Sequence, residues 1–99
     1  MDADERKLRR DLFFEDIGRA FDTGLAIARK HAKEGKDPEG VAREALFACL
    51  HNVFVTFDQG TELADHFNVF VVDEDGNELT EGALHEELVD HLDLTGRYR

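Results

Sequence analysis

Residues 3–33 carry an unbroken helical pattern, and the length of this segment restricts the fold more than any other feature of the sequence. About 30 residues make a helix roughly 45 Å long, which is long for a chain of 99 residues. Such a helix must pack along an equally long partner or be covered in part by another chain. Its apolar stripe follows the 3.6-residue period of a helix and consists of Phe13, Ile17, Ala20, Phe21, Gly24, Ile27, Ala28 and His31. We therefore treat this stripe as a candidate homodimer surface.

A glycine and a proline soon after this segment indicate where one helix ends and the next begins. Gly35 suits the left-handed position after a helix, Asp37 is a capping residue, and Pro38 suits the first helical turn. A second helix is expected over residues 38–57. Nine of the twelve residues from 46 to 57 are apolar, which is typical of a helix that is buried on most sides.

An internal repeat leaves the end of the second helix open to another interpretation. Asn52–Leu63 reads NVFVTFDQGTEL and Asn68–Leu79 reads NVFVVDEDGNEL, with seven of twelve positions identical. If the repeat is structural, each copy is a strand-turn-strand hairpin; if it is chance, only the second copy is. The β-branched and aromatic residues that lead up to Phe57 also fit a strand. We favour a helix that continues through Phe57.

The last third of the chain predicts a β-hairpin followed by a helix. Residues 68–79 form the expected hairpin, because strong turn chemistry at 73–77 follows an apolar run. Thr80 is expected to cap a last helix over 81–93. The predicted fold class is therefore α+β, with two long antiparallel helices, a β-hairpin and a C-terminal helix in a single domain over 1–99.

Charge is distributed unevenly along the chain. Residues 1–43 carry ten acidic and ten basic residues, whereas residues 44–99 carry thirteen acidic and two basic ones, which accounts for the net charge of −11. No lysine or arginine occurs between Arg43 and Arg97. An acidic half repels nucleic acid and anionic membranes and attracts basic partners. The alternative interpretation, that the charge serves only solubility, stays open at this point.

The acidic residues of the second half are the candidate partner-binding residues. They are Asp58, Glu62, Asp65, Asp73, Glu74, Asp75, Glu78, Glu86, Glu87, Asp90 and Asp93. The last four fall within an arc of about 120° on the expected final helix. We expect a small acidic protein-binding module, of the inhibitor or immunity type, that covers a basic site on a partner such as a nucleic-acid-handling protein. Direct contact with nucleic acid or with a membrane is not expected. The alternative function is a structural or assembly protein that oligomerises through its long helices.

Several short motifs are similar to catalytic or metal-binding sequences, but each fails on spacing or context. Asp22-Thr23-Gly24 is similar to the catalytic triplet of aspartic proteases, yet it lies inside a helical pattern instead of a tight loop. The turn from Asp73 places its glycine at position 4, whereas a calcium-binding EF-hand needs it at position 6. His85 and His91 are six residues apart and point away from each other on a helix. The chain contains no serine, and we predict no catalytic residue, no metal ligand, no cofactor and no enzymatic activity.

Cys49 is the only cysteine, and it lies in an apolar run. A disulfide framework is therefore excluded, a buried thiol is expected, and a reducing compartment is the default. The acidic start of the chain does not resemble a signal peptide. No window approaches the roughly 20 apolar residues of a membrane-spanning helix. We expect a cytoplasmic protein.

Overall fold

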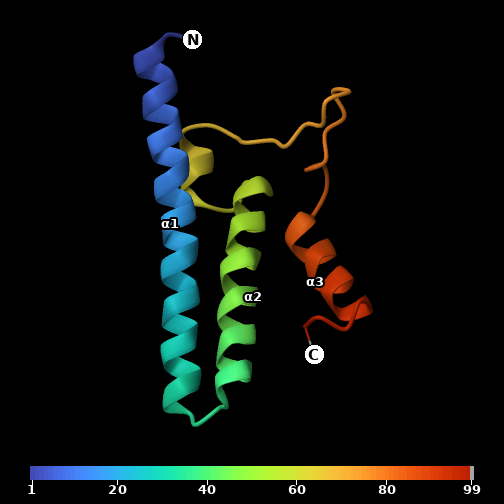
Figure 1. Cartoon of the computed structure of the whole chain (residues 1–99). Helices are drawn as coiled ribbons and strands as arrows, with labels where there is room; N and C mark the ends of the chain where they lie inside the picture. Colours follow the sequence, from blue (N-terminus) through green and yellow to red (C-terminus); the bar gives the residue numbers. More distant parts are fainter. Residues whose placement is uncertain (99) are drawn as a thin grey trace.

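A computed structural model describes residues 1–98, and all regular elements in this range are helical (Figure 1). They are α1 (Ala3–Lys33), α2 (Pro38–Phe57), a short 3-10 helix η1 (Glu62–Asp65) and α3 (Leu84–Leu94). α1 and α2 form a long antiparallel hairpin, and α3 packs on α2 on the side away from α1. The functional surfaces of the chain therefore have to be carried by these helices and by the extended segment between η1 and α3.

The turn between α1 and α2 is determined by local sequence signals. α1 ends where Gly35 adopts a positive φ of 82° and the amide of Lys36 donates to the carbonyl of His31 at 3.1 Å, as in a glycine-terminated helix. Asp37 then caps α2 by accepting from the amide of Gly40 at 2.7 Å, and Pro38 occupies the first turn. The bounds of both helices agree with those expected from the sequence.

The segment that could have been a helix or a strand is helical. α2 continues through Phe57, so the first copy of the internal repeat is mostly helix. The second copy is extended. The repeat is therefore not structural, because similar sequences adopt different conformations where their packing differs.

The predicted β-hairpin is absent, so the α+β fold class was wrong and the described chain is all-helical. Residues 68–79 form one isolated antiparallel bridge, between Val72 and Glu78. The turn itself forms, because Asp73 accepts from the amides of Asp75 and Asn77 at 2.9 Å each. Its flanks do not extend into strands, since apolar side chains such as Val72 and Leu79 are exposed. A two-stranded hairpin without a surface to cover is marginal at best.

The last helix begins later than predicted and is capped by a different residue. α3 starts at Leu84, and Ala83 at its N-cap supplies no side-chain hydrogen bond. Thr80 is buried, and its hydroxyl oxygen accepts from the amide of Val71 at 3.2 Å. It is therefore part of the turn segment and does not cap α3.

A buried carboxylate joins α1 to α2. Asp16 on α1 is only 3% exposed, and it accepts hydrogen bonds from the hydroxyl of Thr56 on α2 and from that of Thr61, at 3.1 Å, in the following loop. Arg19, one turn along α1, forms an ion pair with it at 2.9 Å. A buried charge needs such partners, so this network fixes how the helices align at that end of the hairpin.

The apolar core is thin. Within residues 1–98, Ala20 and Leu63 are the only buried apolar side chains, and no large side chain is fully buried. The molecule is elongated, with principal extents of 50 × 28 × 20 Å. Much of the apolar surface of the helices therefore faces outward.

In the part of the chain that the structure describes, none of the helices combines the length and the apolar character required to cross a membrane.

Candidate functional site

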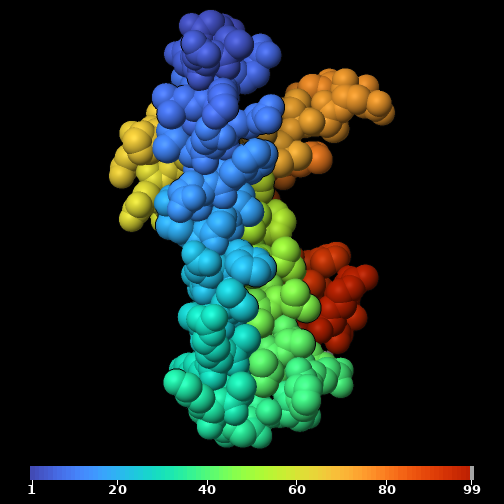
Figure 2. Space-filling view, turned by 60° about the vertical axis from the view of Figure 1, so that its left-hand side comes forward, coloured from blue at the N-terminus to red at the C-terminus, as the bar shows by residue number. Residues whose placement is uncertain are grey.

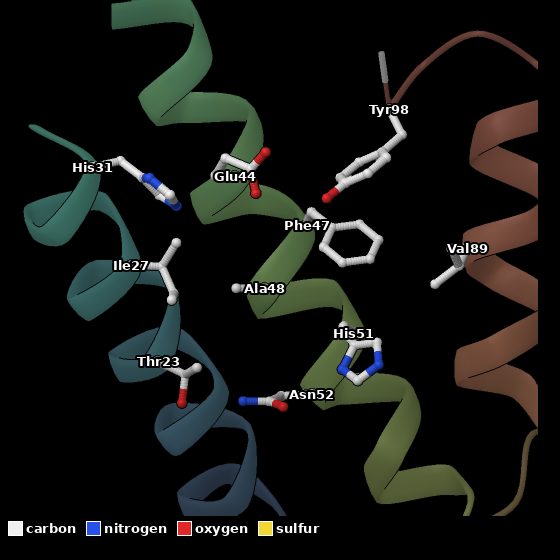
Figure 3. Close-up of a pocket in the computed structure, with 10 residues that line it drawn as sticks. All are labelled: Thr23, Ile27, His31, Glu44, Phe47, Ala48, His51, Asn52, Val89 and Tyr98. Carbon is white, nitrogen blue, oxygen red and sulfur yellow. The ribbon is translucent and has the colours of Figure 1, made fainter. Parts of the chain in front are cut away.

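A groove of about 380 Å³ runs across α2, between α1 and the C-terminal end of the described chain (Figure 3). Its lining is drawn from all three α-helices and from the turn after α3. The lining residues are Thr23, Ile27, His31, Glu44, Phe47, Ala48, His51, Asn52, Val89 and Tyr98. A volume near 300–1,000 Å³ is the range of small-ligand sites, so the groove is the first candidate site.

Helical spacing explains why these residues meet. Thr23, Ile27 and His31 are four residues apart on α1 and so lie on one face. The residues of α2 in the groove likewise recur at intervals of three and four. One face of the hairpin thus forms the floor and one wall, and Val89 and Tyr98 close the other side (Figure 3).

Tyr98 closes the groove through contacts with two residues of α2. Its ring centroid lies 4.3 Å from that of Phe47, and its phenol faces the carboxylate of Glu44 (Figure 3). Burial raises the pKa of the Tyr98 phenol, and the negative charge and the hydrogen bond of Glu44 raise this pKa further. The phenol of Tyr98 therefore stays neutral up to a higher pH than that of an ordinary tyrosine.

Histidines lie in and beside the groove. The ring of His31 reaches into the groove from α1 (Figure 3); its Nδ1 is buried, lies 3.4 Å from a carboxylate oxygen of Glu34, and has no hydrogen-bond partner of good geometry. The ring of His51 contacts that of His85 edge-on, with centroids 5.2 Å apart. His85 is the second residue of α3, so this ring pair joins the groove to the start of that helix.

Asp58 organises the junction between α2 and α3. Its two carboxylate oxygens accept the amides of Leu84 and His85 at 2.9 and 2.8 Å, and one of them also contacts Nδ1 of His85 at 2.5 Å. Burial raises the pKa of the Asp58 carboxyl, but the hydrogen bonds from His85 and Leu84 and the charge of His85 outweigh this effect and lower its pKa below the usual 3.8. Asp58 was predicted to bind a partner; with 9% of its side chain exposed, it serves as the cap of α3.

The other predicted partner-binding residues do not form one surface. Glu62 and Asp65 lie on η1 beside α1 (Figure 2), whereas the turn at residues 73–77 projects away from both long helices (Figure 1). α3 carries a third group (Figure 1). The exposed members of the turn and α3 groups are Glu74, Asp75, Glu78, Glu86, Glu87, Asp90 and Asp93. These two groups lie on the side of α2 that faces away from α1, and η1 is separate from them.

Asp73 is tied into its own turn. Hydrogen bonds from the backbone and side chain of Asn77, followed by those from the amides of Asp75 and Gly76, lower its pKa in spite of some desolvation. Its carboxylate is therefore occupied by local contacts and is a weaker candidate for binding a partner than Glu74 or Asp75.

The arrangement offers hydrogen-bonding groups and aromatic surface but no assembled metal centre. No group of three or more His, Cys, Asp or Glu side chains in residues 1–98 is placed to hold a metal ion. His85 is directed at Asp58, and Cys49 lies on the other face of the hairpin, against Gly24.

Sequence reasoning identified the acidic residues and missed the groove. The spacing of Glu44, Phe47, Ala48 and His51 on α2 was a usable signal, because residues three and four apart share a face. The closure of the groove by Tyr98 had no such signal.

Comparison with known proteins gives no relative: the chain matches no family model, no curated protein sequence and no solved structure.

Proposed function

We propose that this protein acts by contact with a basic protein surface, as a small acidic binding module without catalytic activity. The surface used is formed by the turn acids Glu74 and Asp75 and by Glu86, Glu87 and Asp90 on α3. A partner of the nucleic-acid-handling class fits this surface, because its own ligand is polyanionic. An inhibitor that covers such a site is the corresponding role.

One observation carries the proposal. Within residues 1–98, no lysine or arginine forms an ion pair with any of these five carboxylates, while three cations of α1 and α2 pair with acids of their own helices: Lys7 with Asp11, Arg19 with Asp16 and Arg43 with Glu39. The negative charge on α3 and the turn is therefore not balanced inside the chain. A basic partner would balance it and would be steered toward it over a Debye length.

A basic peptide tests the proposal directly. Binding of a fluorescent oligolysine peptide is measured by anisotropy at ionic strengths of about 0.01 and 1 M, where the Debye length is about 30 and 3 Å. We expect binding at low ionic strength that is lost at high ionic strength. Replacing three α3 carboxylates (Glu86→Gln, Glu87→Gln, Asp90→Asn) should weaken it about tenfold, because exposed charge pairs contribute roughly 0.2–1 kcal/mol each.

A matched control variant distinguishes the effect of where the carboxylates lie from the effect of the net charge. Glu5→Gln, Glu15→Gln and Asp22→Asn remove the same number of exposed carboxylates from α1. This control should bind the peptide within about twofold of the wild type, since the charge it removes lies outside the proposed surface. Equal weakening by both variants would mean that net charge alone attracts the peptide, and the proposed surface would then be wrong.

A second candidate function, that of an assembly protein, is favoured by a different observation. Large apolar side chains of the long helices are exposed, among them Phe14, Phe21, Leu46 and Leu50. Contiguous apolar surface of this kind marks sites of protein association.

A further inference from the structure

We propose that the exposed apolar face of the α1–α2 hairpin binds the same face of a second copy of this chain, so that two hairpins form a four-helix bundle. This hairpin face lies opposite the groove that contains Tyr98. It is made by Phe21, Gly24, Leu25, Ala28, Ala45, Leu46 and Cys49, which line a shallow depression of about 150 Å³. Phe14 and Leu50 continue it along the two helices.

The face is built of large residues around a floor of small ones. Phe21 and Leu46 are 60% and 66% exposed, whereas Gly24 between them is buried. A Cβ at Gly24 would lie 3.0 Å from the carbonyl oxygen of Ala45 and 3.2 Å from Cβ of Cys49. The two helices therefore approach closely here, and the large side chains beside this contact can fit into the corresponding depression of another hairpin, as knobs into holes.

The area that the chain leaves exposed matches what an obligate dimer buries. A compact chain of this mass exposes about 5,700 Å², whereas this one exposes 7,075 Å², an excess of about 1,400 Å². Obligate dimers bury about 1,000–2,500 Å² on each partner. The radius of gyration, 15.7 Å, likewise exceeds the roughly 13 Å of a compact domain of this length. Covering one face of the hairpin would remove part of this surplus, because Phe14, Phe21, Leu46 and Leu50 are among the exposed large apolar residues.

Charge favours a second copy over a basic partner on this face. None of the seven residues that form it is charged, and residues 1–43, which supply α1 and the start of α2, carry no net charge. The acids of α3 and of the turn lie beyond α2, on the side away from α1 (Figure 1). Two chains of net charge −11 can therefore pair through their hairpins while most of their negative charge remains remote from the contact. A two-fold axis makes each residue serve on both sides of the interface.

The mass of the chain in solution tests the pairing. Light scattering coupled to size exclusion should give the mass of two chains for the wild type and of one chain for Leu46→Glu, because a two-fold contact buries the introduced charge twice. Leu94→Glu is the matched control: Leu94 is 87% exposed on α3, outside the hairpin face, and this variant should keep the mass of two chains. A wild type with the mass of one chain, or a Leu46→Glu variant that remains a dimer, overturns the proposal.

Cross-linking locates the contact without depending on a disruptive substitution. In a Cys49→Ala background, Leu46→Cys should form an intermolecular disulfide on mild oxidation, whereas Leu94→Cys should form at least about tenfold less, since a disulfide requires Cα atoms within about 7 Å. Equal cross-linking at both positions would place the contact elsewhere and would overturn the proposed face. Circular dichroism of both variants checks that the helices are retained.

Discussion

The side chain of Asp58 fixes the start of α3. It accepts the two backbone amides at the N-terminus of that helix and a contact from the imidazole of His85. Helix caps of this kind contribute about 0.5–2 kcal/mol, and hydrogen bonds to a charged acceptor lie at the strong end of the range. The position of α3, and hence the closure of the groove by Tyr98, depends on this residue.

Asp58→Asn should lower the free energy of unfolding by about 1–2 kcal/mol at neutral pH. The pKa of Asp58 is lower in the folded chain than in the unfolded one, so its stabilising effect is complete above the unfolded pKa and is lost as pH falls through the folded pKa. The difference between wild type and variant should therefore shrink in acid. Urea unfolding followed by circular dichroism between neutral pH and strong acid measures it.

Asp90→Asn is the control for that series, because it removes an exposed carboxylate from α3 without removing a cap. Its effect should stay within about 0.5 kcal/mol. An Asp58→Asn variant whose stability ran parallel to that of the wild type at every pH would show that the cap does not depend on the charge.

Tyr98 reports on the groove, because it is the only tyrosine and the chain has no tryptophan. Its pKa is raised by burial and by Glu44, so the phenol should ionise above the ordinary value near 10. Glu44→Gln should lower this pKa but leave it above the ordinary value, since the burial remains. Absorbance of the tyrosinate during an alkaline titration measures both.

Glu39→Gln removes another α2 carboxylate, one that pairs with Arg43, and should leave the titration of Tyr98 unchanged. If Glu44→Gln also left the pKa of Tyr98 unchanged, Glu44 and Tyr98 would not be in contact in solution. The groove would then be open on the side that Tyr98 closes.

At the scale of elements, the alignment of α1 with α2 depends on the hydroxyls that contact Asp16. Thr56→Val keeps the shape of the side chain but removes one hydrogen bond to a buried carboxylate. We expect a loss of about 1–3 kcal/mol in the free energy of unfolding. Thr95→Val is the comparison, because that hydroxyl is exposed and bonds only to carbonyls of its own helix. Urea denaturation of both variants should show a smaller loss in the free energy of unfolding for Thr95→Val than for Thr56→Val. Equal losses would contradict the role of Asp16.

The hairpin helices could be predicted from sequence because the signals that bound them are local. Asp37, Pro38 and Gly35 act on residues within a few positions of themselves. The start of α3 could not be predicted in this way, since its cap comes from Asp58, 26 residues before Leu84. Thr80 is a good cap by residue type, but contacts within the turn segment use its hydroxyl instead.

The β-hairpin was wrongly predicted and the groove was not predicted at all, and the reasons are related. An apolar run before a turn forms a strand only if a surface exists for one of its faces to cover, and the helices do not offer one to residues 68–72. The groove needs Val89 and Tyr98 to come alongside α2, which no spacing along the chain specifies. Most of the acidic residues of the second half are exposed, whereas Asp58 is held by the start of α3 and Asp73 by its own turn.

At the scale of the whole molecule, the shortage of buried apolar side chains is the dominant fact. In the part of the chain that the structure describes, no large side chain is fully buried, so there is little of the hydrophobic stabilisation that normally offsets conformational entropy. The exposed hairpin face supplies the missing burial only if a second copy covers it. Folding and association should then be linked, so that the folded state is favoured by mass action.

If folding and dimerisation are linked, the melting temperature depends on protein concentration, which it does not do for a monomer. The melting temperature of the wild type should rise with protein concentration, because each tenfold increase in concentration adds about 1.4 kcal/mol to the free energy that favours the folded dimer over two unfolded chains. For Leu46→Glu the melting temperature should be lower and independent of concentration, since the remaining folded state is a single chain. Leu94→Glu should follow the wild type. Calorimetry over a hundredfold range of concentration distinguishes these cases; a wild-type melting temperature that stayed constant over that range would mean that the hairpin is stable alone, and its exposed phenylalanines and leucines would then need a different explanation.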